Sequence, residues 1–190
     1  MSKHTNDTQI SYSLLTKDYQ ELLDFVYPID ANEGTYSHRI YEIYLRTATE
    51  FENVCKQQLV LDGYNKKPKD MKIGDYQTLD NKLNLSSLEV GLLFWNPVIK
   101  HIKPFGDWKT GAELKWYSDY NKVKHNRAEN FEKANFLNLT MGLAGLFLVS
   151  YKLFGRSFFN QYQTMISSSG KSSGGVTETF FPNSPFSVRK

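Results

Sequence analysis

Apolar side chains recur every three to four positions along three stretches of the chain, which is the spacing of one face of an α-helix. The first stretch, 37–59, contains neither proline nor glycine. The second stretch covers 112–125. The third, 131–154, follows Asn130, a residue type that caps helix N-termini, and precedes Gly155, a residue type common just after helix C-termini. These patterns predict three main helices.

The segments around these helices have weaker patterns. Residues up to Ser13 show no sustained period and predict a loose N-terminal tail, which a short helix over 17–26 follows. Repeated proline and glycine residues between 60 and 111 predict an irregular segment. Within it, 83–95 alternates partly between apolar and polar residues, and this pattern fits a short strand as well as a helix.

Together these elements predict an all-α fold. We expect a helical bundle with an irregular insertion, able to hold short strands, between the first long helix and the last two. A chain of 190 residues suffices for one ordinary domain with a substantial core. We expect a single helical domain over 1–166, with its core at 37–154, and a flexible Ser/Gly-rich C-terminal tail over 167–190.

The composition limits the function classes only broadly. A formal net charge of +3 permits an anionic partner without requiring one. Cys55 is the only cysteine, which excludes an intramolecular disulfide and suits a reducing compartment, so we expect a cytoplasmic location. The 4 histidines lack the spacing of metal-binding motifs, and we expect neither a metal site nor a cofactor.

The stretch 136–154 is apolar over nearly the length that crosses a bilayer, and Lys152 is its only charged residue. Its small residues Gly142, Ala144 and Gly145 suit close helix packing instead. We interpret the stretch as the buried central helix of the bundle and expect no membrane association. A single-span membrane protein remains the alternative.

A polar cluster precedes this central helix. Asn121, Lys124 and His125 fall on one helical strip, and Arg127 lies close to it if the helix continues. Two cations can hold a phosphate while an imidazole, which titrates near neutral pH, moves a proton. This combination predicts phosphodiester chemistry. The alternative is a helix terminus whose basic side chains interact with the last carbonyl groups.

The first long helix offers a second polar strip. Arg46, Glu50 and Asn53 follow one another at helical spacing beside the apolar face, so we expect them to support the 121–127 cluster. Glu50 would then orient His125 or pair with Arg127. The alternative is an exposed face that carries an Arg46–Glu50 ion pair.

The long helix SHRIYEIYLRTATEFENVCKQQL, the segment Tyr-Asn-x-Val-Lys-His-x-Arg and the apolar helix after it resemble the HEPN-like proteins of bacteria over about 37–154. The family's hallmark, Arg-x4–6-His, is not matched, because the positions at that spacing before His125 hold Tyr120, Asp119 and Ser118. In this chain the arginine, Arg127, follows the histidine instead.

The resemblance implies a small helical, homodimeric, RNA-directed protein of phage defence or a toxin–antitoxin system, with an antitoxin or defence protein as partner. It further implies a metal-independent endoribonuclease in which His125 assists attack of a ribose 2′-hydroxyl on phosphate, and Arg127 and Lys124 stabilise the developing charge. Asn121 and Glu50 would position these groups. The second hypothesis is a non-catalytic helical interaction module in a defence or regulatory complex.

Overall fold

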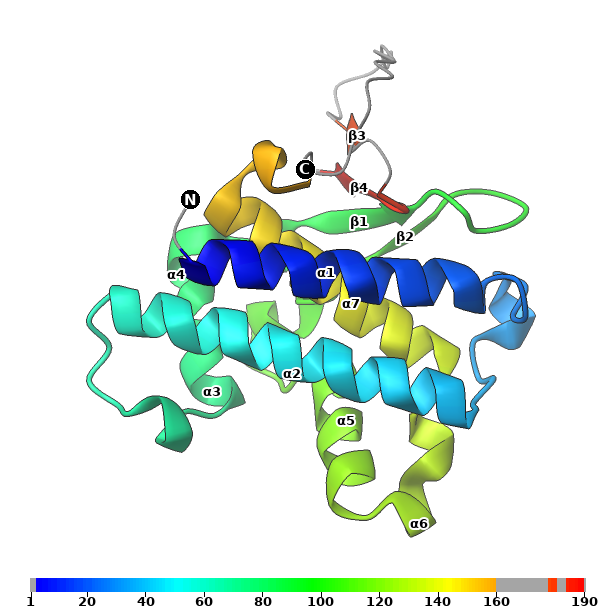
Figure 1. The fold of residues 1–190 in the computed structure, drawn as a ribbon, viewed down its shortest axis with the longest axis horizontal. Helices are drawn as coiled ribbons and strands as arrows, with labels where there is room; N and C mark the ends of the chain where they lie inside the picture. Colours follow the sequence, from blue (N-terminus) through cyan, green and yellow to red (C-terminus); the bar gives the residue numbers. More distant parts are fainter. Residues whose placement is uncertain (1–2, 160–177, 181–183, 190) are drawn as a thin grey trace.

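The computed structural model describes residues 3–159, 178–180 and 184–189, and its described part is mainly helical with a small antiparallel sheet (Figure 1). The helices are α1 (Lys3–Leu22), α2 (His38–Leu61), α3 (Ile73–Tyr76), α4 (Asp80–Leu83), α5 (Lys115–His125), α6 (Arg127–Asn130) and α7 (Phe136–Phe154). The strands are β1 (Glu89–Leu92), β2 (Lys100–Ile102), β3 (Glu178–Phe180) and β4 (Phe186–Arg189). Short 3-10 turns cover Asp30–Asn32, Pro68–Asp70, Gln77–Leu79, Leu85–Ser87, Gly106–Thr110, Phe131–Lys133 and Arg156–Phe159.

The predicted first long helix is confirmed as α2. Ser37 caps it, because the Ser37 hydroxyl accepts a hydrogen bond from the Ile40 N–H at 3.2 Å. The apolar positions that define its helical period, among them Tyr44 and Phe51, are buried. The helix therefore forms where the sequence pattern places it.

The central helix is α7, which packs against α1, α2 and α5. It is long and apolar enough to cross a membrane, but 72% of its apolar window is buried inside the domain. Its two glycines lie against one aromatic side chain, since a Cβ at Gly142 or Gly145 would come within 3.4 or 3.3 Å of Trp116. The small residues of α7 thus serve helix packing within the protein.

The start of α7 differs from the prediction. The helix begins at Phe136 rather than near 131, and its cap is Asn135, whose side chain accepts a hydrogen bond from the Asn138 N–H at 2.9 Å. The predicted cap, Asn130, ends the short helix α6 instead. A separate turn over 131–133 therefore lies between α5 and α7.

The N-terminal prediction is wrong. Instead of a loose tail and a short helix over 17–26, α1 runs from Lys3 to Leu22 and packs along α2 (Figure 1). Its buried face includes polar residues, and its members are Thr8, Gln9, Tyr12, Leu15, Thr16, Tyr19 and Leu22. Because the buried residues in the first half of α1 include polar ones, an apolar helical period is visible in the sequence only in the second half of the helix.

The insertion over 60–111 is irregular, as predicted, and 83–95 contains strand β1 rather than a long helix. The sheet has the order β2-β1-β4-β3 with antiparallel pairs throughout. Val90 of β1 stands opposite Ile102 on one side and Val188 on the other, and all three residues are buried. The sheet thus joins the end of the chain to its middle.

The predicted flexible tail over 167–190 does not stay apart from the domain at its far end. Strand β4 pairs with β1, and Phe186 and Val188 belong to the buried core. The remainder of that prediction, over 167–177, over 181–183 and at 190, lies outside the described residues. The core therefore includes residues beyond the predicted limits of 37–154 at both ends of the chain.

Candidate functional site

The 121–127 cluster lies at a corner where α5 ends and α6 begins, on the side of α2 away from the sheet (Figure 1). His125 is the last residue of α5, and Arg127 is the first residue of α6. Both side chains are exposed, as is Lys124, while Asn121 is half-buried. The chain turns between the two helices at Asn126, which has non-helical backbone angles. Sequence proximity and this turn bring the four predicted residues to one corner.

The other half of α5 is fixed in the core. The Trp116 indole N–H donates a hydrogen bond to the Pro104 carbonyl at 2.9 Å, and its ring meets Phe51 edge to face. The Tyr44 hydroxyl of α2 donates a hydrogen bond to the Trp116 carbonyl. These contacts hold the first turns of α5 against α2 and so fix where its last turn emerges.

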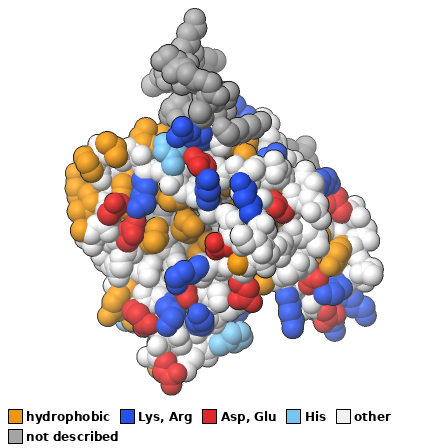
Figure 2. All heavy atoms as spheres, turned by 180° about the vertical axis from the view of Figure 1, so that it is seen from behind, with side chains coloured by type: hydrophobic (Ala, Val, Ile, Leu, Met, Phe, Trp, Pro, Cys, Tyr) orange, Lys and Arg blue, Asp and Glu red, His pale blue; other side chains and the backbone are white. Residues whose placement is uncertain are grey.

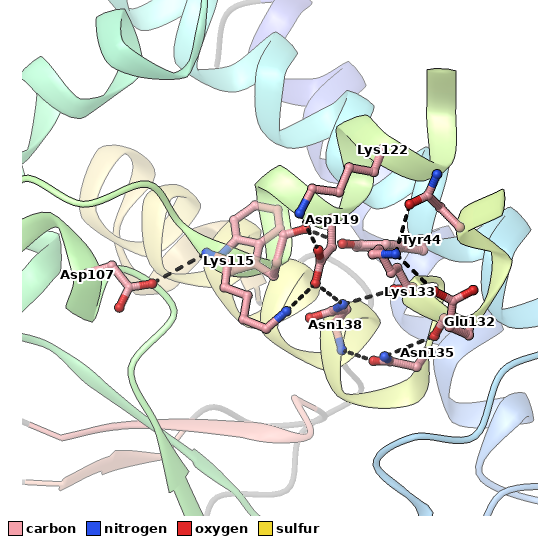
Figure 3. A network of polar contacts seen from close by, with 11 residues as sticks. Tyr44, Asp107, Lys115, Asp119, Lys122, Glu132, Lys133, Asn135 and Asn138 are labelled. Atoms are coloured by element: carbon pink, nitrogen blue, oxygen red, sulfur yellow. Dashed lines mark hydrogen bonds and ion pairs between the residues drawn. The ribbon is translucent and has the colours of Figure 1, made fainter. Parts of the chain in front are cut away.

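A buried carboxylate also anchors α5 (Figure 3). The Asp119 side chain is 3% exposed and accepts contacts from Lys115 at 2.6 Å, Lys122 at 3.3 Å and the Asn138 amide at 3.1 Å. Burial alone would raise the pKa of Asp119, but the Lys115 ammonium, the Asn138 amide and Lys122 outweigh it and lower the pKa. Because Asn138 belongs to the first turn of α7, the network ties α5 to α7.

A second polar cluster joins α5 to α2 through Glu52, which the sequence pattern did not single out. The Tyr117 hydroxyl donates to Glu52 at 2.9 Å, and the ammonium groups of Lys56 and Lys124 lie 3.0 and 4.0 Å from its carboxylate. Lys124 also donates to the Tyr120 hydroxyl at 3.0 Å. Hydrogen bonding to Tyr120, and then the charge of Glu52, raise the pKa of Lys124. Glu52 is therefore the carboxylate of α2 that reaches the cluster.

The three predicted supporting residues do not reach the cluster. Arg46 pairs with Asp18 of α1, burial raises the pKa of Glu50 beside α1, and Asn53 lines an apolar groove at the end of α2. At about 100° per residue, these positions lie roughly 180–240° around the helix from Tyr44, which faces α5. The predicted arrangement is therefore not formed, and since Glu50 and Glu52 both flank Phe51, no local signal in the sequence pointed to Glu52.

Arg127 contacts one ring of an aromatic cluster. The Arg127 guanidinium lies 5.4 Å from the centre of the Tyr41 ring. The Phe131 ring contacts Tyr41 at 6.0 Å, Tyr36 at 5.5 Å and the His38 imidazole at 4.9 Å between ring centres. We call Tyr36, His38, Tyr41 and Phe131 the aromatic corner. Tyr36 and His38 are exposed, and Tyr41 and Phe131 are half-buried.

Within the ranges that the structure describes, no group of three or more His, Cys, Asp or Glu side chains is placed to hold a metal ion. Comparison with known protein families, curated proteins and solved structures finds no match to this chain. The functional argument therefore depends on the chemistry of the corner itself.

Proposed function

We propose that this protein is a HEPN-like, RNA-directed helical bundle of the bacterial cytoplasm, acting in phage defence or a toxin–antitoxin system, and that it cleaves RNA without a metal ion. One observation carries the proposal: His125 and Arg127 lie two residues apart at an exposed corner, and neither side chain forms a hydrogen bond or an ion pair with another described residue. An imidazole and a guanidinium are thus available to a ligand at the same point of the surface.

The proposed reaction transfers the phosphate within the RNA. His125 accepts the proton of a ribose 2′-hydroxyl while its oxygen bonds to the adjacent phosphorus. The bond from phosphorus to the 5′-oxygen breaks, that oxygen takes a proton from a water molecule as it leaves, and His125 returns its proton to the solvent. Arg127 binds the phosphate oxygens and stabilises the additional charge. The products are a 2′,3′-cyclic phosphate and a 5′-hydroxyl.

The other predicted residues have lesser parts in this proposal. Lys124 is shared with Glu52 and Tyr120, so it contributes positive charge near the corner rather than a free ammonium. Asn121 is half-buried one turn before His125 and positions the end of α5. Between 115 and 133 the chain has five cationic residues and three carboxylates, and this excess supports binding of a polyanion.

A homodimer is part of the proposal, because two corners facing each other would form a cleft for a strand of RNA. An antitoxin or defence protein is the proposed protein partner. In this arrangement each copy supplies its own His125 and Arg127.

A non-catalytic interaction module is the second candidate, and a different surface favours it. Phe25, Tyr27, Val98 and Ile99 are exposed where α1 ends and the β1–β2 hairpin turns, and hydrophobic side chains gather at this end of the molecule (Figure 2). The Asn96 N–H donates to the Pro28 carbonyl at 2.9 Å, which joins the two loops. Exposed apolar patches of this kind are typical of protein interaction sites.

RNA cleavage in the presence of EDTA tests the proposed function. Purified protein is incubated with total RNA and with tRNA, beside His125→Ala, Arg127→Ala and the control Glu129→Ala. Glu129 is exposed on α6, two residues beyond Arg127. We expect cleavage with 2′,3′-cyclic phosphate ends by the wild type and by Glu129→Ala, and a loss of at least about 100-fold in His125→Ala.

The two candidate functions give different results in this assay. Cleavage that persists in His125→Ala would remove His125 from the mechanism. Absence of cleavage by the folded wild type would favour the interaction module, and substitutions at Phe25 and Val98 would then be tested for loss of a partner.

A further inference from the structure

We infer that the aromatic corner binds an unpaired nucleobase of single-stranded RNA, next to the phosphate that Arg127 holds. The inference deepens the proposed function and rests on it for the identity of the polymer. It assigns a substrate class to the site, because a base can lie against an aromatic ring only when it is not stacked in a duplex.

The rings of the aromatic corner form one connected surface. The Phe131 ring meets Tyr36 at an interplanar angle of 82° and Tyr41 at 70°, while His38 inclines to it at 38°. Tyr36 is 51% exposed. Such a surface offers aromatic faces and edges to a flat ligand, and every nucleobase has a face that can stack on them.

The aromatic corner is held in place before any ligand binds. The Phe136 N–H donates to the Thr35 carbonyl at 2.8 Å, and the Leu137 N–H donates to the Glu33 carbonyl at 3.0 Å. Tyr36 forms an isolated antiparallel bridge with Asn135. The loop before α2 is therefore fixed to the start of α7, and Tyr36 loses little conformational freedom when a base stacks on it.

Charge favours a nucleotide over an apolar peptide at this position. Arg127 lies over the Tyr41 ring, is exposed, and makes no ion pair with any residue in the described ranges. A base stacked on the rings would place its own phosphate beside this free guanidinium. The apolar patch at Phe25 and Tyr27 has exposed rings as well, but the cation beside it, Lys100 over the Trp95 ring, already forms ion pairs with Asp30 and Glu33.

Fluorescence anisotropy of a 5′-labelled 12-nucleotide RNA tests the inference. Measurements are made in EDTA on the His125→Ala background, so that cleavage does not alter the probe. Tyr36→Ala removes an exposed ring, Tyr36→Phe retains it, and Phe25→Ala removes an exposed ring at the other end of the molecule. Because loss of one base–aromatic stack costs about 1–3 kcal/mol, we expect Tyr36→Ala to weaken binding about 5- to 150-fold.

The controls define the expected pattern. Tyr36→Phe and Phe25→Ala should stay within about twofold of the background protein, and a fully paired duplex of the same sequence should bind more weakly than the single strand. Arg127→Ala should weaken binding and reduce its dependence on salt, as expected for loss of a phosphate contact.

Three results would overturn the inference: unchanged binding in Tyr36→Ala, an equal loss in Phe25→Ala, or no binding of single-stranded RNA. The proposed function fails separately. If the wild type does not cleave RNA but Tyr36→Ala loses binding, the nucleobase site stands without the ribonuclease. If cleavage depends on His125 but Tyr36→Ala binds and cleaves normally, the ribonuclease stands without the nucleobase site.

Discussion

The packed part of α5 and the corner that follows at its C-terminal end differ sharply, although they are adjacent in the sequence. From Trp116 to Val123, the side chains that face α2 and α7 are buried and partnered. From Lys124 to Arg127, every residue is exposed, and the His125 side chain has no hydrogen-bonding partner among the described residues. The packed part of α5 therefore stabilises the fold. The side chains at the corner are exposed and can contact a ligand.

The difference arises from what α5 packs against. Its first turns cross α2 beside Phe51, whereas its last turn passes beyond the packing surface and the chain reverses at Asn126. A substitution in the packed part should therefore lower stability. A substitution at the corner should change function while the fold stays intact.

Trp116→Ala should have the largest effect on the packed part. It removes a buried ring that contacts Phe51 and lies against Gly142 and Gly145 of α7. We expect the free energy of unfolding in urea to fall by about 3–5 kcal/mol. Trp116→Phe, which keeps a ring but loses the hydrogen bond to Pro104, should cost less. A loss below about 1 kcal/mol in Trp116→Ala would contradict the described packing.

Asp119→Ala should have the next largest effect. In this variant the mostly exposed ammonium groups of Lys115 and Lys122 become hydrated, but the buried Asn138 amide loses a hydrogen-bond acceptor. We expect a loss of about 1–3 kcal/mol in the same urea measurement. Glu129→Ala, at the exposed corner, should stay within about 0.5 kcal/mol and serves as the matched control. Equal losses in the two variants would contradict the difference between the packed part of α5 and the corner.

The free energy of unfolding should depend on pH through two buried carboxylates, Asp119 and Asp75. Since its partners lower the pKa of Asp119 in the folded state, its contribution is present above the unfolded pKa and is lost as pH falls through the folded value. Asp75 adds to this loss: burial opposes its ionisation, but Lys66, the Lys72 N–H and Tyr64 lower its pKa to about 2. Urea unfolding should therefore show stability falling between about pH 4 and pH 2. Asp119→Asn should be less stable at neutral pH and show a shallower fall, whereas an unchanged slope would contradict the assignment.

His125→Ala and Arg127→Ala should have the smallest effect on stability. Both side chains are exposed, and Arg127 has only its cation–π contact with Tyr41. We expect changes within about 0.5 kcal/mol, measured as thermal unfolding midpoints close to that of the wild type. A larger loss would show that the corner is structural, as at an ordinary basic helix terminus.

The long periodic helices could be predicted from sequence, while elements with mixed faces could not. Helix α2 has an apolar period, a serine cap and no internal glycine or proline, so local signals agree. Helix α1 buries Thr8 and Gln9 on its packing face, and its first half therefore resembles a polar tail. Strand β4 is a short segment beyond a Ser/Gly-rich stretch, and its burial depends on a partner, β1, nearly one hundred residues earlier in the chain.

The candidate site shows the same division. Asn121, Lys124, His125 and Arg127 are close in sequence, so their meeting at one corner could be predicted. Which carboxylate of α2 joins them could not be predicted, because Glu50 and Glu52 are both acidic residues on this helix. The orientation of α2 selects Glu52 for Tyr117 and Lys124 and turns Glu50 toward α1.

The sequence determined the main helices, the central position of the apolar helix α7 and the local cluster of polar residues, because helical period and caps act within a few residues. Tertiary structure alone decided which faces of α2 meet α1 and α5, and that β4 joins the core. It also brought Tyr36 and His38 to Phe131, across nearly one hundred residues of chain. Such contacts depend on how whole elements pack, and no local pattern encodes the partner that an element will meet.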